Sequence, residues 1–246
     1  MTSVNPSAAR QVKGVKEVKR LVIGIALIAL SASPALAETP PSAPPGATNA
    51  LPSGNPPVRY DWQGNHKKAQ AALNARDYKT AIKLFTEILE SGRLPKTWLA
   101  PTLYMRGKAY RSSRQYNLAV ADYLAAVEAD PKMDVAYYEL GATYQATDQH
   151  AKAAQAFGQA IAIKGNNADY YYGRCVSYSW LGNYKAAISD CETATRMRPR
   201  DADMLGSLGR LYEDSGQKAK AIETYKLALT INPRQPEALD GLSHLK

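Results

Sequence analysis

The amino-acid sequence predicts an all-α fold in which antiparallel helix pairs stack into a solenoid. In residues 137–165, small residues and large, mostly aromatic residues recur at helical spacing on two segments that a polar break separates. The same classes of residue return when the window is shifted by 34 residues in either direction. A fixed period of this length is typical of stacked repeats, in which each pair needs a neighbour to bury its apolar face.

The composition of the 246-residue chain is that of a globular protein, with 45% hydrophobic and 22% charged residues. The chain has 16 Tyr but only 2 Phe. Tyrosine can pack its ring and keep its hydroxyl in water, which suits a thin two-layer architecture. The formal net charge is +9, of which residues 1–37 supply +4, and both signs are interspersed elsewhere. We therefore expect no nucleic-acid partner.

Residues 1–37 are typical of a secretory signal peptide. Basic residues between 13 and 20 precede the apolar run 21–30, and small residues end in Ala-Leu-Ala before Glu38. We expect Sec-type export, cleavage after Ala37 and a location in the bacterial periplasm, with no membrane span left. The alternative is a membrane anchor at an uncleaved N-terminus. However, residues 21–37 are fewer than the roughly 20 that a spanning helix needs.

Residues 38–61 form a segment rich in Pro, Ala, Gly and Ser. Its few bulky apolar residues bury too little surface to offset the entropy of ordering, so we predict a disordered linker. A Pro-rich recognition peptide is the alternative function of this segment.

Four units after the linker share one skeleton. In the third unit it reads Tyr137-x2-Leu140-Gly141-x2-Tyr144 and then Ala153-x3-Phe157. The units end at equal intervals, at Pro131, Gly165, Pro199 and Pro233. This sequence resembles the tetratricopeptide repeat family, whose skeleton is W-x2-L-G-x2-Y, then A-x3-F, then P. The resemblance implies a right-handed solenoid of about five 34-residue repeats.

The predicted solenoid covers residues 62–246. Its units are approximately 62–99, 100–133, 134–167, 168–201 and 202–235, followed by a C-terminal capping helix over 236–246. The first unit is degraded, because Ala69 and Ala72 stand where Gly and Tyr are expected. Four extra residues follow it, in a stretch with two prolines and Trp98, and predict a longer connection to the second unit.

The sequence shows no pattern typical of an enzyme. His66, His150 and His244 lie in different units, and no His, Cys and Asp cluster has metal-ligand spacing. The glycines recur with the repeat period, so helix packing explains them without a phosphate loop or a nucleophile elbow. We predict no catalysis, no cofactor and no metal site.

The two cysteines, Cys175 and Cys191, occupy the Gly-like and Phe-like positions of the fourth unit, which face each other across the helix pair. In an exported protein they could form a disulfide. The alternative is two buried free thiols, because helix axes 8–10 Å apart can hold the Cα atoms beyond the limit near 7 Å.

The family resemblance implies a partner-binding face on the first helix of each pair. Ligand contacts in the family come from the residue after the Trp-like position and from offsets of four and seven beyond it. In this sequence these positions are Tyr104, Lys108, Arg111, Tyr138, Ala142, Gln145, Tyr172, Val176, Ser179, Gly206, Arg210 and Glu213. We expect them to line a concave groove that binds a protein or peptide, with three tyrosines in a row. The alternative is that the tyrosines only cover the surface of thin repeats.

Some members of the family grip a terminal carboxylate with a Lys and Asn clamp, which is not matched here. Tyr138 and Ala142 stand where the clamp needs Lys and Asn. We predict that the double substitution Tyr138→Ala and Tyr172→Ala weakens partner capture and leaves the melting temperature nearly unchanged.

The function that the sequence predicts is that of a non-enzymatic adaptor that binds a peptide or protein partner in the periplasm. One alternative is a scaffold subunit of an envelope or surface-polysaccharide assembly complex. Another is a structural protein that associates with itself through Trp98 and the degraded first unit. An accessory subunit for a cell-wall enzyme, or a small hydrolase, is the alternative from a different class.

Overall fold

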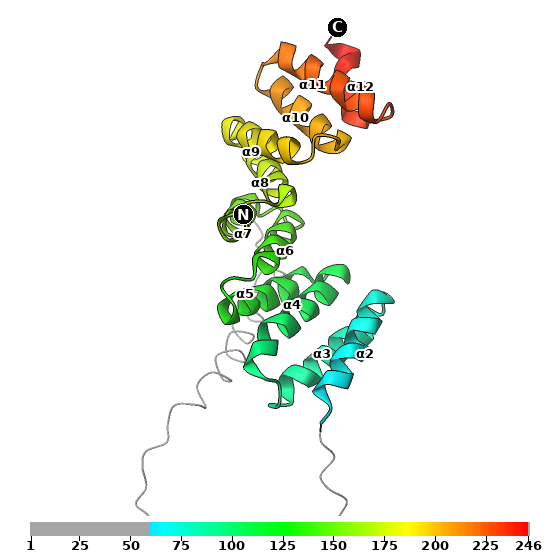
Figure 1. Cartoon of the computed structure of the whole chain (residues 1–246), viewed down its shortest axis with the longest axis vertical. Helices are drawn as coiled ribbons and strands as arrows, with labels where there is room; N and C mark the ends of the chain where they lie inside the picture. The colour runs from blue at the N-terminus through cyan, green and yellow to red at the C-terminus, as the bar shows by residue number, and fades with distance from the viewer. Residues whose placement is uncertain (1–59, 246) are drawn as a thin grey trace, which may run out of the picture. The chain divides into compact units, whose positions relative to one another are not determined.

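The computed structural model describes residues 60–245, and within them every regular element is an α-helix (Figure 1). The predicted signal peptide, and the predicted linker as far as residue 59, lie outside the described residues. The helices are α2 (Trp62–Asn74), α3 (Tyr78–Glu90), α4 (Lys96–Ser112), α5 (Tyr116–Ala129), α6 (Asp134–Gln145), α7 (His150–Ile163), α8 (Ala168–Trp180), α9 (Tyr184–Met197), α10 (Ala202–Asp214), α11 (Lys218–Ile231) and α12 (Pro236–His244). Over residues 60–245, each helix is too short or too polar to cross a membrane.

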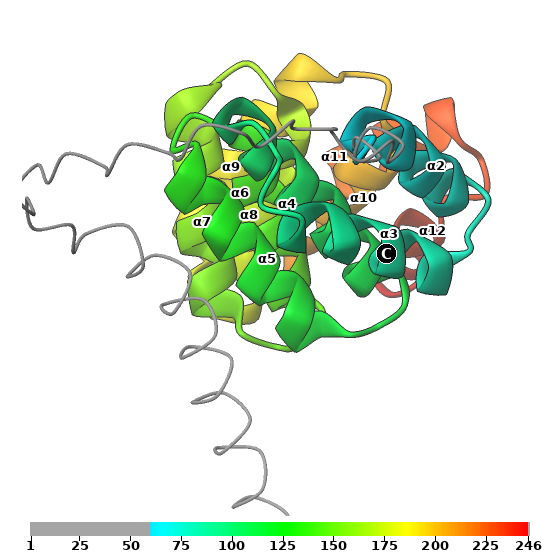
Figure 2. The same ribbon diagram turned by 90° about the horizontal axis from the view of Figure 1, so that it is seen from below.

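The helices pair in chain order, and each pair packs on the next (Figures 1 and 2). Five units result: α2 with α3, α4 with α5, α6 with α7, α8 with α9, and α10 with α11. The last helix, α12, packs on both helices of the fifth unit. The expected all-α stack of helix pairs with a C-terminal capping helix is confirmed.

Short polar side chains begin several helices. Asp61, Asp77 and Asp201 accept hydrogen bonds from backbone N–H groups in the first turns of α2, α3 and α10. Asn167 and Asn183 do the same for α8 and α9. Such caps satisfy donors that have no partner inside the helix, so the sequence fixes where these helices begin.

The second unit begins earlier than the sequence predicted. Helix α4 starts at Lys96, about one turn before residue 100, and runs for 17 residues with Pro101 inside it. The four extra residues therefore lengthen a helix, and the connection from α3 stays short. One result is that Trp98 lies in the first turn of α4, where it packs against the first unit.

An aromatic ring lies against a glycine in most units. A Cβ added at Gly141 would lie 2.9 Å from the Phe157 ring, and one at Gly107 would lie 2.8 Å from the Tyr123 ring. The Phe157 ring also reaches the next unit, because a Cβ at Gly173 would lie 2.6 Å from it. Only glycine leaves room for this approach, so the Phe157 ring joins its own helix pair to the following one.

Two units contain a largely buried ion pair that the sequence analysis did not predict. The Arg106 guanidinium donates to both carboxylate oxygens of Asp122, over 2.8 and 2.7 Å. Arg174 donates to Asp190 in the same way, over 2.7 and 2.8 Å. In the third unit the equivalent of these arginines is Leu140, so the second and fourth units replace an apolar contact between their two helices with a charged one.

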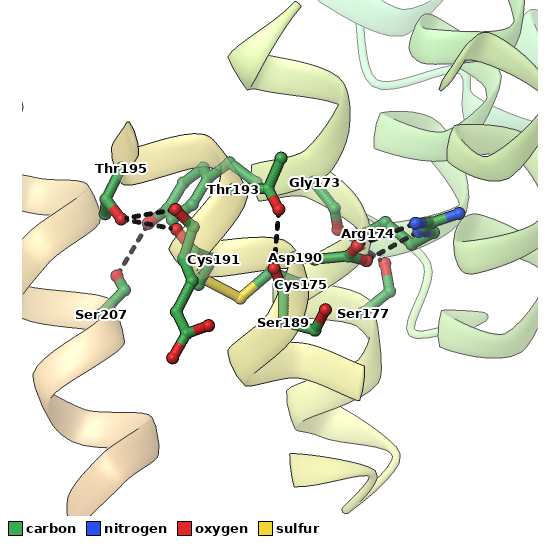
Figure 3. Close-up of a disulfide and its surroundings, with 12 residues drawn as sticks. Gly173, Arg174, Cys175, Ser177, Ser189, Asp190, Cys191, Thr193, Thr195 and Ser207 are labelled. Atoms are coloured by element: carbon green, nitrogen blue, oxygen red, sulfur yellow. Dashed lines mark hydrogen bonds and ion pairs between the residues drawn. A yellow bond between two sulfur atoms is a disulfide. The ribbon is translucent and has the colours of Figure 1, made fainter. Parts of the chain in front are cut away.

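The fourth unit replaces the glycine and aromatic pair with two cysteines. The Cys175 and Cys191 Sγ atoms are joined in a disulfide, with the Cα atoms 5.5 Å apart. Figure 3 shows the bridge between α8 and α9, beside the Arg174–Asp190 ion pair. The two Cα atoms lie on the facing sides of the helices, which brings them closer than the helix axes.

Reduction of this disulfide is expected to lower the free energy of unfolding by about 3 kcal/mol, because the bridge closes a short loop in the unfolded chain. Guanidinium chloride unfolding with and without a phosphine reductant measures the change. A Cys175→Ala and Cys191→Ala double variant should not respond to the reductant. If peptide mapping of the protein without reduction found both thiols free, the bridge would be contradicted.

Candidate partner-binding face

The first helices of neighbouring units touch one another and form a continuous layer. Helix α2 contacts α4, α4 contacts α6, and α6 contacts α8. The link from α8 to α10 includes a hydrogen bond of 2.8 Å between the Tyr172 and Ser207 hydroxyls. We use the term first-helix face for the twelve partner-binding positions that the sequence predicts on α4, α6, α8 and α10. Within each helix these positions are four and seven residues apart, which places them on one side.

The three tyrosines of the face are partly buried and pack between units. The ring centre of Tyr138 lies 5.3 Å from that of Tyr170 and 5.7 Å from that of Phe157. The Tyr104 ring lies 6.1 Å from the Tyr123 ring. Burial, with a smaller effect of nearby charges, raises the pKa of Tyr104 to about 12, so its hydroxyl stays neutral at physiological pH.

These contacts change the expectation for the double tyrosine variant. Because Tyr138 contacts two rings and Tyr172 bonds to the next unit, their replacement by alanine removes packing as well as surface. We now expect this variant to melt at a lower temperature than the wild type. Substitutions at more exposed positions of the face are therefore better tests of partner binding.

The basic residues of the face are partly matched by carboxylates. The Arg111 Nη1 atom lies 3.4 Å from the Glu139 Oε2 atom, and the Arg210 Nε atom lies 3.4 Å from Asp214 Oδ1. The Arg111 side chain is 38% exposed, whereas that of Glu139 is 15% exposed. The Lys108 Nζ atom lies 5.6 Å from the centre of the Tyr104 ring. Helix α4 therefore presents positive charge to solvent while the neighbouring carboxylate lies beneath it.

Two further residues of the face hold the stack together. Gln145 on α6 donates from Nε2 to the Gly173 carbonyl oxygen at 2.9 Å and to the Ser177 hydroxyl at 3.0 Å, which ties α6 to α8. Glu213 on α10 accepts a hydrogen bond of 2.8 Å from the Tyr225 hydroxyl. The remaining polar position on α8, Ser179, is partly buried. Gln145 and Glu213 are thus engaged within the protein.

The second oxygen of Glu213 contacts the capping helix, which predicts a pH dependence. Glu213 Oε1 and His244 Nε2 are 2.6 Å apart, and this hydrogen bond raises the pKa of His244 above its ordinary value of 6.5. Burial raises the pKa of Glu213, but the hydrogen bonds from His244 and Tyr225 outweigh it, so the pKa of Glu213 is lowered overall. Stability from a raised histidine pKa is fully present below pH 6.5 and is lost as the pH rises through the folded value.

The His244→Asn variant tests this dependence. We expect it to melt below the wild type at about pH 6 and by a smaller margin at about pH 8.5, because the contribution of the charged histidine is lost as the pH rises through its raised pKa. Calorimetry of both proteins at the two pH values measures the margins. An equal margin at both would show that the charge of His244 does not matter.

His66 belongs to the row of aromatic residues on the first helices, although the sequence analysis did not place it there. It stands three residues before Ala69, as Tyr104 stands three before Gly107. His66 is 8% exposed, with its ring centre 5.1 Å from that of Trp98 and 5.5 Å from that of Phe85. The degraded skeleton of the first unit hid this register.

The structure shows no metal centre in the part of the chain that it describes. Over residues 60–245, no three or more His, Cys, Asp and Glu side chains are gathered in a way that could hold a metal ion. Three open cavities surround the connection between α9 and α10 and are lined in part by Arg196, Arg198 and Arg200. None of these three is lined by a residue of the first-helix face.

Comparison with known families identifies the repeat. A tetratricopeptide repeat model matches residues 178–236, a second matches residues 135–167, and a TPR repeat model matches residues 107–148. The chain contains tetratricopeptide repeats. The matched segments include α6, α7, α9, α10 and α11 in full but only the last three residues of α8.

Curated relatives share these repeats over part of their length. Tetratricopeptide repeat protein 6 of Homo sapiens is 32% identical over 172 residues, which are 69% of this chain and 32% of that protein. The Hsp70-Hsp90 organizing protein of Triticum aestivum is 26% identical over 174 residues, which are 71% of this chain and 28% of that protein. This chain thus spans less than a third of the length of these relatives.

Solved structures show the same repeat fold. The crystal structure of MamA protein matches with 25% sequence identity and a TM-score of 0.64. The match covers 70% of this chain and 92% of the MamA chain. The structure of YrrB, described as a TPR protein with an unusual peptide-binding site, is 20% identical with a TM-score of 0.65. The match covers 74% of this chain and 92% of the YrrB chain. At this sequence identity the likeness shows the fold alone.

Proposed function

We propose that this protein is a non-enzymatic adaptor that binds a protein or peptide partner through its first-helix face. The observation that carries the proposal is the continuous layer of α4, α6 and α8, which presents three partly exposed tyrosines beside outward-facing Lys108 and Arg111. Aromatic rings supply contact area at a low cost in conformational entropy, and arginine supplies directed hydrogen bonds. The peptide-binding site named for YrrB supports this reading of the fold.

We further propose that the adaptor works in the periplasm of a bacterium. The basic residues 13–20, the apolar run 21–30 and the small residues before Glu38 support export. A disulfide between the only two cysteines is in keeping with an oxidising compartment. Mass spectrometry of the protein isolated from expressing cells tests export, since the mature chain should begin at Glu38.

Capture of partners from a periplasmic extract tests the binding face. The bait is the exported protein, and the test variant carries Lys108→Glu and Arg210→Glu, both on the face. The Arg210 side chain is 56% exposed, and the Lys108 ammonium lies over the face of the Tyr104 ring, outside the buried clusters of the core, so neither replacement opens the core. We expect the variant to retain about a tenth or less of the captured partner, because charge reversal at an interface repels the groups it attracted.

The matched control reverses the same amount of charge away from the face. Lys226 on α11 and Arg234 in the loop before α12 are both exposed, so Lys226→Glu and Arg234→Glu change the net charge equally. This control should capture as much partner as the wild type. Undiminished capture by the face variant would place the binding site elsewhere. The partner's identity, read by mass spectrometry, also decides whether the adaptor serves an envelope or surface-polysaccharide assembly complex.

Self-association is a second candidate function, and the start of α4 favours it. Trp98 is 41% exposed and the adjacent Leu99 is 39% exposed, which is a large apolar surface for one helical turn. If copies associate there, light scattering should give a higher mass at high protein concentration, and Trp98→Ala should remove the increase. A constant mass would exclude this function.

A further inference from the structure

Trp180 continues the first-helix face beyond the positions that the family resemblance implies. It stands four residues after Val176 and eight after Tyr172 on α8, so all three lie on one side of that helix. It is 71% exposed, the most exposed of the large hydrophobic side chains in residues 60–245. A single exposed apolar side chain needs no explanation, so the surroundings of the indole decide whether it marks a contact with another molecule.

The Trp180 side chain is held in place by the preceding unit. Its indole stacks on the imidazole of His150, with ring centres 5.2 Å apart and planes at 4°. His150 is the first residue of α7 in the third unit, so the indole reaches across the boundary between units. Ala146, the residue that follows α6, takes the place in the third unit that Trp180 has in the fourth. The stacked indole is therefore fixed before any partner arrives.

The surroundings of Trp180 are uncharged along the face. Ala142 and Gln145 on α6, with Val176 and Ser179 on α8, carry no charge, whereas α4 carries Lys108 and Arg111. Two more exposed apolar side chains follow Trp180 in the chain, Leu181 at 49% and Tyr184, the first residue of α9, at 37%. The face thus has charged parts on α4 and α10 and an uncharged part between them on α6 and α8.

We propose that Trp180 is the apolar anchor of the first-helix face and receives an aliphatic or aromatic side chain of the bound partner segment. This inference rests on the proposed function and adds the chemistry of the partner at one end of the face. Its basis is continuity, because a segment that lies over Tyr172 and Val176 meets the indole one turn later on the same side of α8. A fixed aromatic ring loses little entropy on binding, and tryptophan is typical of residues that dominate binding energy.

Peptides selected on the protein provide the test. Random twelve-residue peptides are selected by display on the exported protein, and the peptide most sensitive to Lys108→Glu and Arg210→Glu is synthesised. We expect Trp180→Ala to weaken its binding about tenfold or more, as loss of a hot-spot aromatic residue does. Replacing the apolar residue of the peptide should have the same effect. The matched control Leu124→Ala removes a side chain that is 46% exposed on the second helix α5 and should leave the affinity unchanged.

Variants of His150 test whether binding needs the indole to be held in place or only needs the indole to be present. His150→Phe retains an aromatic surface under Trp180 and should bind the peptide as the wild type does. His150→Ala leaves the indole unsupported and should weaken binding by less than Trp180→Ala does. If His150→Phe, His150→Ala and Trp180→Ala all bound the peptide as tightly as the wild type, the proposal would be overturned.

Fluorescence reports directly on Trp180. In a Trp62→Phe and Trp98→Phe background it is the only tryptophan, and the peptide should shift its emission to the blue and reduce acrylamide quenching. If that background unfolds, the affinities of the single variants decide. Suppose that a peptide depends on Lys108 and Arg210 and yet leaves the Trp180 emission unchanged and binds Trp180→Ala as tightly as the wild type. That result overturns the role of Trp180 and leaves the proposed function standing. Failure to select any face-dependent peptide contradicts the proposed function as well. A blue shift with phosphatidylglycerol vesicles or with rising protein concentration, and none with peptide, replaces the proposal by a lipid or self-association surface.

Discussion

Replacement of Asp122 by alanine is expected to lower the free energy of unfolding by about 3 to 5 kcal/mol, because it leaves the buried Arg106 guanidinium without its counter-charge. The two side chains are only 19% and 7% exposed, and two hydrogen bonds join them. Arg106 has one further hydrogen-bond partner in the described residues, the Thr86 hydroxyl at 3.2 Å, which carries no charge. Guanidinium chloride unfolding followed by helical circular dichroism measures the loss.

A double variant shows whether the loss comes from the stranded charge. Arg106→Leu with Asp122→Ala copies the third unit, where Leu140 and Ala156 occupy these positions in the core. We expect the double variant to recover most of the stability, since an apolar pair of suitable volume can replace a buried ion pair at little cost. A double variant as unstable as Asp122→Ala would show that the ion pair itself stabilises the second unit.

Replacement of Phe157 by alanine is expected to cost about 3 to 5 kcal/mol, the usual range for removal of a buried ring. The side chain is 1% exposed and lies against Gly141 of its own unit and Gly173 of the next. The cavity would therefore open both inside the third unit and between the third and fourth units. Because stability in a stack depends on contacts between neighbours, both units should become easier to unfold.

The same helix supplies the control for this prediction. Ile163, at the end of α7, is 37% exposed, and Ile163→Ala should change the free energy of unfolding by about 0.5 kcal/mol or less. Hydrogen exchange should show faster opening of α6 to α9 in Phe157→Ala and not in Ile163→Ala. A loss below about 1 kcal/mol for Phe157→Ala would mean that the ring does not join the two units.

The fold was predictable because the contact that recurs in several units, between a glycine and an aromatic ring, joins residues that are close in sequence. Gly141 and Phe157 are only 16 residues apart, so one window of the sequence contains both sides of the contact. The early start of α4 was not predictable in the same way. The prolines at 95 and 101 suggested a broken connection, whereas contacts of Trp98 with Trp62 and His66 accompany an extra helical turn.

The candidate site was harder to predict, because its side chains meet across units. The offsets of the repeat place Tyr138 and Gln145 on α6, but only the stack brings Tyr138 onto Tyr170 and Gln145 onto Gly173 and Ser177. The sequence therefore assigned to binding some groups that also hold the repeats together. Trp180 was overlooked although it continues the same helical spacing by one more turn, which a search for exposed aromatics at that spacing would find.

The central claim is that the first-helix face, and not the layer of second helices, binds the partner. Site-specific photo-cross-linking in cells tests it most directly, with a benzophenone amino acid at Lys108 on α4 or at Leu124 on α5 of the same unit. We predict a cross-linked partner from position 108 and none from position 124. Cross-linking from position 124 alone would contradict the claim and move the binding site to the second helices.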